Sequence, residues 1–176
     1  MKIYNAFFLL LIGVIIQSCM TPKKAGYCTN YLTDEQKREF TDSMNYYRTL
    51  EGVPLVKYSF IHEPLSMIRI KTIFEHVRET PVEELEKDAV YHYHYGIEAD
   101  SKSYFDSVPL YNVVWSENVA VGKTLFYKKD LFHGWKSSPK HWDNMMNPDI
   151  KYISLCECIS SKNGFTLAVL SLFSAE

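Results

Sequence analysis

The C-terminal part of the chain carries the pattern that most restricts its possible folds. Residues 152–159 and 165–173 are both rich in residues that favour β-strands, and Asn163-Gly164 lies between them. Asn-Gly favours the tight turn that joins two antiparallel strands, because these two residue types adopt a positive φ more readily than most others. The sequence therefore predicts a C-terminal β-hairpin, and any fold of this chain has to contain it.

Helical signals follow residue 32. Residues 33–36, Thr-Asp-Glu-Gln, form a capping box, in which the threonine and glutamine side chains accept hydrogen bonds from each other's backbone N–H groups. Residues 80–83, Thr-Pro-Val-Glu, form a second such box. These signals and the apolar spacing predict one helix from residue 34 that ends at Gly52, a second from near Pro64 with a stripe of Met67, Ile70, Phe74 and Val77, and a third from about Pro81 to Tyr91.

The middle of the chain mixes strand and helix signals. Residues 91–96, Tyr-His-Tyr-His-Tyr-Gly, alternate in a way that predicts a strand end with His92 and His94 on one side. Residues 111–115 are β-rich and lead into 116–122, whose small residues predict a turn around Glu117. Further helices are predicted to open at Tyr104-Phe105, to run from Leu125 to Trp135, and to start at Ser138-Pro139 and carry His141, Trp142 and Met145.

Residues 1–18 are interpreted as a signal peptide. Lys2 supplies a positive charge, and the apolar run from residue 6 to residue 16 is too short to span a bilayer comfortably. The sequence Ile16-Gln17-Ser18-Cys19 resembles the lipobox of bacterial lipoproteins, which are cleaved before the cysteine and carry a diacylglycerol on its thiol. Cys19 is thus the predicted lipidation site, residues 19–32 a tether, and the bacterial envelope, with the outer membrane favoured, the predicted location.

The net charge limits the class of binding partner, and the cysteines limit the possible disulfides. The formal net charge of −2 argues against a nucleic-acid partner, which leaves a basic footprint. Besides Cys19 the chain contains Cys28, Cys156 and Cys158, and an oxidising compartment permits a disulfide. Cys156 and Cys158 point to one face of the predicted strand and rarely bond each other there, so a bridge is expected to join Cys28 to one of them. Buried thiols are the alternative.

Four groups of residues, taken in order, resemble motifs of the CAP superfamily, which contains cysteine-rich secretory proteins, antigen 5 and plant pathogenesis-related proteins. The resemblance is greatest to its bacterial branch of SCP-like extracellular domains and covers about residues 34–173. It implies an α+β fold, a three-layer α-β-α sandwich with a central, mainly antiparallel sheet, over residues 33–176. The matching residues are Asn45-Tyr46-Tyr47-Arg48 with Gly52 and Leu55; Ser116-Glu117-Asn118, where serine replaces the family's glycine; Trp135, Ser138-Pro139-Lys140-His141, Asn144 and Asn147-Pro148; and Tyr152-Ile153.

The resemblance also implies a cleft. In the family this cleft commonly holds two histidines and two glutamates, which bind a divalent metal in some members. Glu117 matches the first glutamate, His94 matches the first histidine with His92 as the competing choice, and His141 is the histidine of the bacterial branch. The second glutamate falls near Ser138 and the second histidine within residues 164–168, and both are missing. The predicted cleft, and the candidate ligand set for a metal such as zinc, is therefore His94, Glu117 and His141.

Two functions follow from this cleft. Two imidazoles and a carboxylate can hold zinc with an open position for water, which would make a hydrolase acting on envelope peptide or ester. Such a hydrolase also needs a general base, and Glu117 cannot easily be both ligand and base. The favoured function is therefore a non-catalytic envelope module that binds a hydrophobic ligand, a glycan or a protein partner, with the metal-dependent hydrolase as the alternative and a purely structural envelope protein as a third. In the non-catalytic case Glu117 is expected to form hydrogen bonds inside the sandwich.

Overall fold

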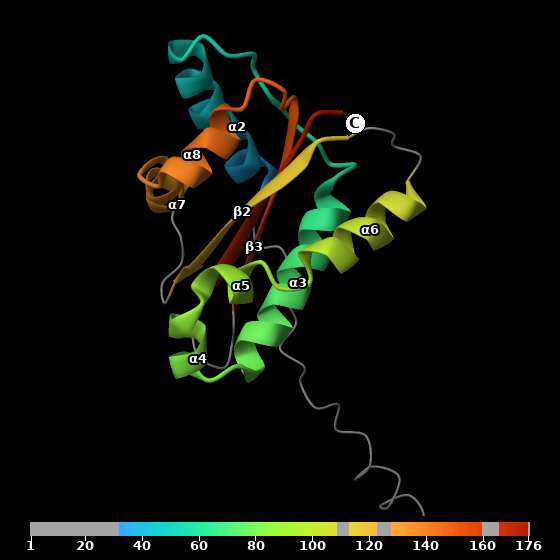
Figure 1. The fold of residues 1–176 in the computed structure, drawn as a ribbon. Helices are drawn as coiled ribbons and strands as arrows, with labels where there is room; N and C mark the ends of the chain where they lie inside the picture. The colour runs from blue at the N-terminus through green and yellow to red at the C-terminus, as the bar shows by residue number, and fades with distance from the viewer. Residues whose placement is uncertain (1–31, 109–112, 123–127, 160–165, 176) are drawn as a thin grey trace, which may run out of the picture.

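The computed structural model describes residues 32–108, 113–122, 128–159 and 166–175. A four-stranded sheet in the order β1-β3-β4-β2 forms its centre (Figure 1). β1 runs parallel to β3, and the other two pairs, β3 with β4 and β4 with β2, are antiparallel. The strands are β1 (Lys57–Tyr58), β2 (Trp115–Gly122), β3 (Tyr152–Ile159) and β4 (Thr166–Phe173).

Helices cover both faces of this sheet, which makes the predicted three layers (Figure 1). One face carries α2, α7 and α8, and the other carries α3 with α5 and α6 beside it. The structure therefore has the predicted α+β class and the mainly antiparallel sheet. The helices are α2 (Asp34–Leu50), α3 (Glu63–Glu79), α4 (Val82–Lys87), α5 (Ala89–Tyr93), α6 (Ile97–Ser107), α7 (Lys128–Lys136) and α8 (Pro139–Met146).

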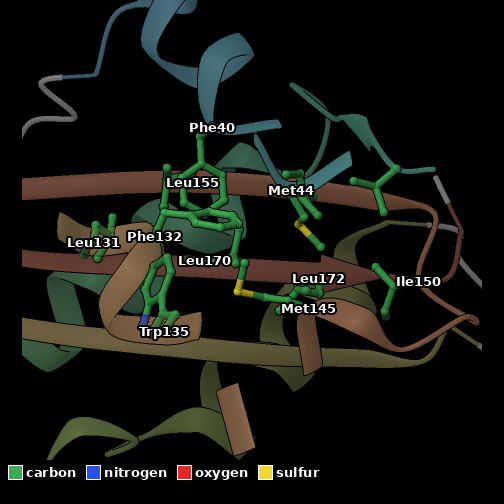
Figure 2. Close-up of a cluster of buried hydrophobic side chains, with 13 residues drawn as sticks. Phe40, Met44, Leu131, Phe132, Trp135, Met145, Ile150, Leu155, Leu170 and Leu172 are labelled. Carbon is green, nitrogen blue, oxygen red and sulfur yellow. The ribbon is translucent and has the colours of Figure 1, made fainter. Parts of the chain in front are cut away.

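The larger core lies between the sheet and α2, α7 and α8 (Figure 2). Alternate residues of β3 and β4 point into it, because successive strand residues face opposite sides of a sheet. Phe40 of α2 meets Trp135 of α7 edge to face, with ring centroids 5.9 Å apart. The residues that pack there include Phe40, Met44, Leu131, Phe132, Trp135, Met145, Ile150, Leu155, Leu170 and Leu172.

The second core lies on the other face, under α3. Ile70, Ile73 and Phe74 of that helix pack on the remaining residues of the strands, among them Val169. Every residue of β4 is buried, because β4 is an inner strand with helices on both sides. This explains why its sequence is an almost continuous apolar run instead of an alternation.

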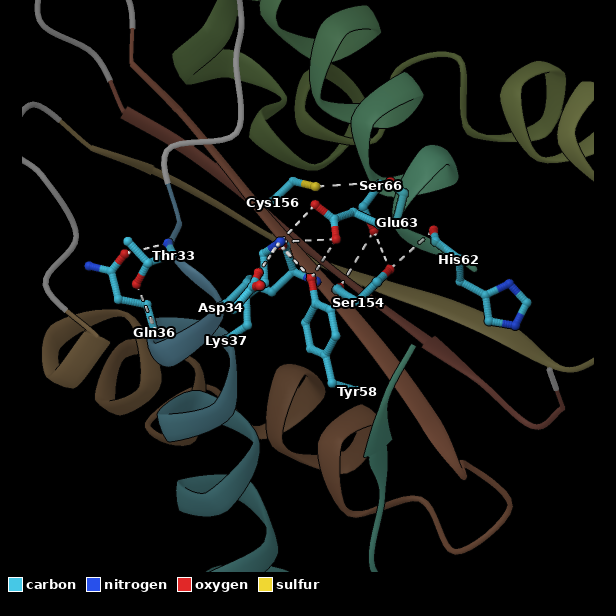
Figure 3. Close-up of polar contacts among 11 residues, drawn as sticks. Thr33, Asp34, Gln36, Lys37, Tyr58, His62, Glu63, Ser66, Ser154 and Cys156 are labelled. Carbon is cyan, nitrogen blue, oxygen red and sulfur yellow. Dashed lines mark hydrogen bonds and ion pairs between the residues drawn. The ribbon is translucent and has the colours of Figure 1, made fainter. Parts of the chain in front are cut away.

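A partly buried polar cluster joins α2 and α3 to the sheet (Figure 3). The Lys37 ammonium of α2 donates to both carboxylate oxygens of Glu63, the first residue of α3, at 2.9 and 3.0 Å. The Tyr58 hydroxyl lies 3.4 Å from this carboxylate and donates to the Leu155 carbonyl at 3.2 Å. Burial raises the pKa of Tyr58. The cluster fixes the starts of two helices against the edge of the sheet where β1 ends.

The first capping box was predicted correctly, whereas the second one and several of the middle segments were not. At the second box, α4 begins after Pro81 without a side-chain cap, and the Thr80 hydroxyl donates to the His76 carbonyl at the end of α3. The first capping box is present, with Gln36 N–H donating to the Thr33 hydroxyl at 3.2 Å, and α2 ends at Leu50, just before the predicted Gly52. The predicted third helix is broken at Asp88 into α4 and α5. The strand predicted at residues 91–96 is wrong, because α5 and a helical turn occupy it, and the turn predicted around Glu117 is wrong, because the residue lies within β2.

Two further differences concern length and pairing. The helix predicted to open at Tyr104 begins earlier, at Ile97, and β1 was not predicted because two residues carry no pattern. In the C-terminal hairpin both strands are confirmed and pair antiparallel, from Tyr152 opposite Phe173 to Ile159 opposite Thr166. Its Asn163-Gly164 turn lies outside the described residues.

The cysteines follow the predicted geometry. Cys156 and Cys158 lie on the same face of β3, in the core under α3. Cys158 is disulfide-bonded, whereas Cys156 is a buried thiol whose pKa is raised by burial. The signal peptide, Cys19, most of the tether and Cys28 lie outside the described residues. No helix within the described ranges is long and apolar enough to cross a membrane.

Candidate functional site

A buried ion pair between Arg69 and Glu117 forms the centre of the candidate site. Glu117 lies in the middle of β2 and Arg69 in α3, and both side chains are almost fully shielded from solvent. The guanidinium binds the carboxylate with two parallel hydrogen bonds, Nε to Oε2 and Nη2 to Oε1, each 2.9 Å long. This bidentate geometry is the strongest that an arginine and a carboxylate can form. It ties the edge strand of the sheet to the helix that covers it.

The turn between α5 and α6 completes the network. His94, which ends α5, brings Nδ1 to 2.8 Å from Glu117 Oε1. The remaining nitrogen of the Arg69 guanidinium, Nη1, donates to Asp100 Oδ2 at 2.6 Å and to the Tyr95 carbonyl at 2.9 Å. One buried arginine thus holds three separate points of the chain. We refer to Arg69, His94, Asp100 and Glu117 as the arginine network.

Gly96 allows this turn to approach α3. Its φ of 72° lies in the left-handed region, and a Cβ placed there would come within 2.8 Å of the Thr72 methyl group. A residue with a side chain would therefore be strained and would also push the turn away from α3. The glycine lets His94 and Asp100 reach Glu117 and Arg69.

The network keeps Glu117 ionised. Burial alone would raise the pKa of its carboxyl, but the hydrogen bonds from His94 and Arg69, together with the positive charge of Arg69, outweigh burial and lower it. An ionised carboxylate only accepts hydrogen bonds, so His94 donates through Nδ1–H. In the neutral ring this leaves Nε2, on the other side of the imidazole, as an acceptor.

His141 approaches the same edge strand from the opposite face of the sheet. The neighbour of Glu117, Asn118, points toward α8, where its Nδ2 donates to the His141 carbonyl at 3.0 Å and its Oδ1 accepts from Asn144 at 2.9 Å. Burial, and then the charge of His94, lower the pKa of His141, so the two imidazoles lie within electrostatic range of each other. Among the contacts of the described residues, none joins the His141 imidazole to Glu117 or to His94.

The helical conformation of α5 points His92 and His94 in different directions. His94 contacts Glu117, whereas His92 turns to α3, where its Nδ1 lies 2.9 Å from Nε2 of His76. Tyr95 stacks on the His76 ring with centroids 3.8 Å apart and planes 5° from parallel. His92 and His76 therefore hold α5 against α3 and take no part in the arginine network.

The contact between His76 and His92 leads us to expect that the protein is less stable in mild acid. Burial, and then the neighbouring charge of His92, lower the pKa of His76 from 6.5. The unfolded chain therefore binds a proton at a higher pH than the folded chain, so the free energy of unfolding falls as the pH drops below about 6.5 toward the folded pKa. In urea titrations between about pH 7 and about pH 5, His76→Gln is expected to show a flatter decline than the wild type. His133→Gln, which replaces an exposed histidine, is the control, and an equal slope for all three proteins would contradict the prediction.

A pocket of about 700 Å³ opens beside the network, between α5 and α6. His94 and Asp100 line it, so the network forms part of its wall. Tyr91 and Tyr95 contribute aromatic surface, and the two residues are 56% and 40% exposed. Thr72, Val90, Gly96, Ile97, Glu98 and Ala99 complete the lining.

The structure places the three residues of the predicted cleft unequally. His94 and Glu117 are in direct contact, and His141 lies across the strand. Arg69 and Asp100 were not among the predicted residues. Arg69 carried a usable signal, because it lies one helical turn from Ser66 and from Ile73 on the buried face of α3, where a lone charge requires a buried partner.

The geometry gives Glu117 partners other than a metal. Both of its oxygens accept hydrogen bonds, from Arg69 and, at Oε1, also from His94. Within the described part of the chain, no three His, Cys, Asp or Glu side chains are grouped in a way that could hold a metal ion. The zinc site formed by His94, Glu117 and His141 stays a prediction.

Comparison with known proteins gives matches only through the structure, since neither a family model nor a curated protein matches the sequence. An outer surface protein from Borrelia burgdorferi has a TM-score of 0.56 at 15% identity, over 85% of this chain and 100% of that one. A cysteine-rich secretory protein from Staphylococcus aureus has a TM-score of 0.51 at 15% identity, over 88% and 40%. An extracellular protein containing a SCP domain from Bacillus anthracis has a TM-score of 0.50 at 13% identity, over 84% and 45%.

These similarities define the class of the fold. Two of the three proteins are named for the cysteine-rich secretory class or its SCP domain, and the chain matches less than half of the length of each. The fold is therefore CAP-like, as the ordered motifs around Asn45, Glu117 and His141 predicted. At such low identity the likeness shows the fold alone.

Proposed function

We propose that this chain is a bacterial cell-envelope protein, anchored by a lipid on Cys19, whose CAP-like domain binds a ligand without catalysing a reaction. The observation that carries the proposal is the state of Glu117: its carboxylate is buried and its oxygens are held by Arg69 and His94. A catalytic base or a metal ligand needs a carboxylate that can accept a proton or an ion. Releasing Glu117 for this purpose would leave Arg69 buried beside it with one partner fewer.

The pocket beside the arginine network supports a binding role. Its volume of about 700 Å³ suits a small molecule, since such sites are concave, mostly apolar and carry a few well-placed polar groups. The polar groups here are His94 and Asp100, which the network holds in place. A rigid wall of this kind favours recognition, because little side-chain freedom is lost when a ligand binds.

The location rests on the N-terminal sequence and on the related folds. Residues 16–19 match a lipobox, and the similar structures are named as an outer surface protein, a secretory protein and an extracellular protein. We expect Cys19→Ser, expressed as the full chain in a bacterium fed an alkyne fatty acid, to lose both the lipid label and the membrane association of the wild type. Cys28→Ser is the matched control and should keep the label. A labelled Cys19→Ser protein would rule out the anchor.

Metal uptake separates the binding module from the hydrolase. In calorimetric titration with zinc, we expect the wild type to show no saturable one-to-one uptake, because Glu117 is already held by Arg69. His94→Ala and His92→Ala form a matched pair, since only His94 contacts Glu117. Stoichiometric zinc binding that disappears in His94→Ala but survives in His92→Ala would instead support the hydrolase.

A further inference from the structure

We infer that the pocket between α5 and α6 binds an organic ammonium compound, that is, a positively charged amine carried on an apolar chain. The inference rests on the proposed binding function and adds the chemical class of the ligand. Three features of the lining support it: two tyrosine rings, an uncompensated negative charge and a hydrogen-bond acceptor.

The first feature is the aromatic wall. Tyr91 and Tyr95 both line the pocket and meet edge to face, with ring centroids 6.0 Å apart. Tyr95 is held in position by its stack on His76. The faces of tyrosine rings attract cations, and their area also packs against an alkyl chain. The exposed Val90 extends this apolar surface.

The second feature is the balance of charge. In the arginine network the guanidinium of Arg69 faces two carboxylates, Glu117 and Asp100, so one negative charge is left over when His94 is neutral. Glu98 adds another carboxylate to the lining, and its exposed side chain makes no ion pair with another described residue. Among the described residues that line the pocket there is no lysine or arginine. A cation is therefore attracted to this pocket and an anion is repelled.

The third feature is the orientation of His94. Its Nδ1–H donates to Glu117, which fixes the ring and leaves Nε2 as an acceptor in the neutral imidazole. Because His94 also lines the pocket, an ammonium N–H has an acceptor at the wall. A quaternary amine has no N–H, so a primary amine is the better match to this site.

Three probes with the same alkyl chain test the inference on the full-length protein in detergent. Hexylammonium, hexanol and heptanoate each carry a hexyl chain and differ in the charge of the head group at mildly alkaline pH. Binding is followed by chemical-shift changes of the tyrosine ring protons. We expect hexylammonium to bind with a dissociation constant of about 1 mM, and hexanol and heptanoate to bind about tenfold more weakly or not at all.

Matched variants assign the effect to the pocket. Glu98→Gln is expected to weaken the affinity for hexylammonium about fivefold. Glu51 is an exposed glutamate at the end of α2, and Glu51→Gln should leave this affinity unchanged. Tyr91→Leu keeps apolar bulk but loses the face of the ring, so it should weaken the binding of hexylammonium. Tyr91→Phe keeps the ring and should leave this binding unchanged. Neither position belongs to the core, so the variants are expected to fold.

The outcomes separate the ligand class from the proposed function. Equal binding of all three probes, with no effect of Glu98→Gln, would overturn the ammonium assignment and leave an apolar binding pocket. Absence of hexylammonium binding would also overturn it. In that case a different ligand, recovered by native mass spectrometry from protein purified out of the envelope, would still support the binding module.

Discussion

Replacing Arg69 by methionine is expected to lower the free energy of unfolding by about 3–5 kcal/mol. The substitution keeps an apolar stem of similar length. Among the described residues it removes the only cation within hydrogen-bond distance of the buried Glu117 carboxylate, apart from a protonated His94. It also frees Asp100 and the Tyr95 carbonyl, so the turn between α5 and α6 loses its tie to α3. Urea denaturation followed by circular dichroism measures the effect.

The double variant Arg69→Met with Glu117→Gln is the decisive control. If the loss comes from an unpaired buried charge, then neutralising that charge should restore part of the stability, and the two substitutions will not be additive. The comparison remains informative even if the single variant unfolds. A loss of less than about 1 kcal/mol for Arg69→Met, or strict additivity, would mean that the pair contributes little beyond packing.

Replacing Arg48 by methionine is expected to cost about 4 kcal/mol. Arg48 is completely buried in α2 and donates to four backbone carbonyls, those of Pro54, Met145, Asn147 and Ile150, at 2.5, 2.6, 3.1 and 3.1 Å. Each of these carbonyls loses the hydrogen bond from Arg48, although the Asn147 carbonyl keeps one from the Ile150 N–H at 3.2 Å. The loss is expensive where the bond is buried, as it is at Met145 and Ile150. The end of α8 and the segment that leads into β3 should lose protection from amide exchange first.

Two control variants show whether the loss of stability comes from the hydrogen bonds of Arg48. Arg48→Lys keeps the charge but cannot reach four acceptors from one ammonium, so it should recover only part of the loss. Arg78→Met removes a partly exposed arginine paired with Glu79 and should change stability by less than about 0.5 kcal/mol. An Arg48→Met protein as stable as Arg78→Met would show that water replaces the guanidinium.

The role of Arg48 explains one of the motifs on which the resemblance rested. The Asn45 side chain forms hydrogen bonds with both the N–H and the carbonyl of Val56, at 2.8 and 2.9 Å. Arg48 donates hydrogen bonds to the backbone carbonyls at and after the end of α8. The two residues, one turn apart on α2, therefore fix the segment before β1 and the segment between α8 and β3. This pair is a structural device of the fold and predicts nothing about chemistry in the cleft.

Local sequence determined the elements whose signals are local. The capping box at Thr33, the proline at the start of α3, and the apolar runs of β3 and β4 each specify their element through neighbouring residues, and all were predicted. Segments without such signals were missed. Residues 91–96 alternate like a strand, yet their contacts with α3 through His76 and Arg69 hold them as a helix and turn.

The residues of the candidate site also fall into two groups, those that the sequence suggested and those that only the tertiary structure placed. The sequence alone pointed to Glu117, His94 and His141 as cleft candidates, because their motifs occur in an order that resembles a CAP-like fold. It could not place Arg69 beside Glu117, since 48 residues separate the two positions and only the packing of α3 on the sheet brings them together. In the structure Glu117 is one half of a buried ion pair, because a charged carboxylate inside a protein needs a partner and the tertiary fold brings Arg69 within reach.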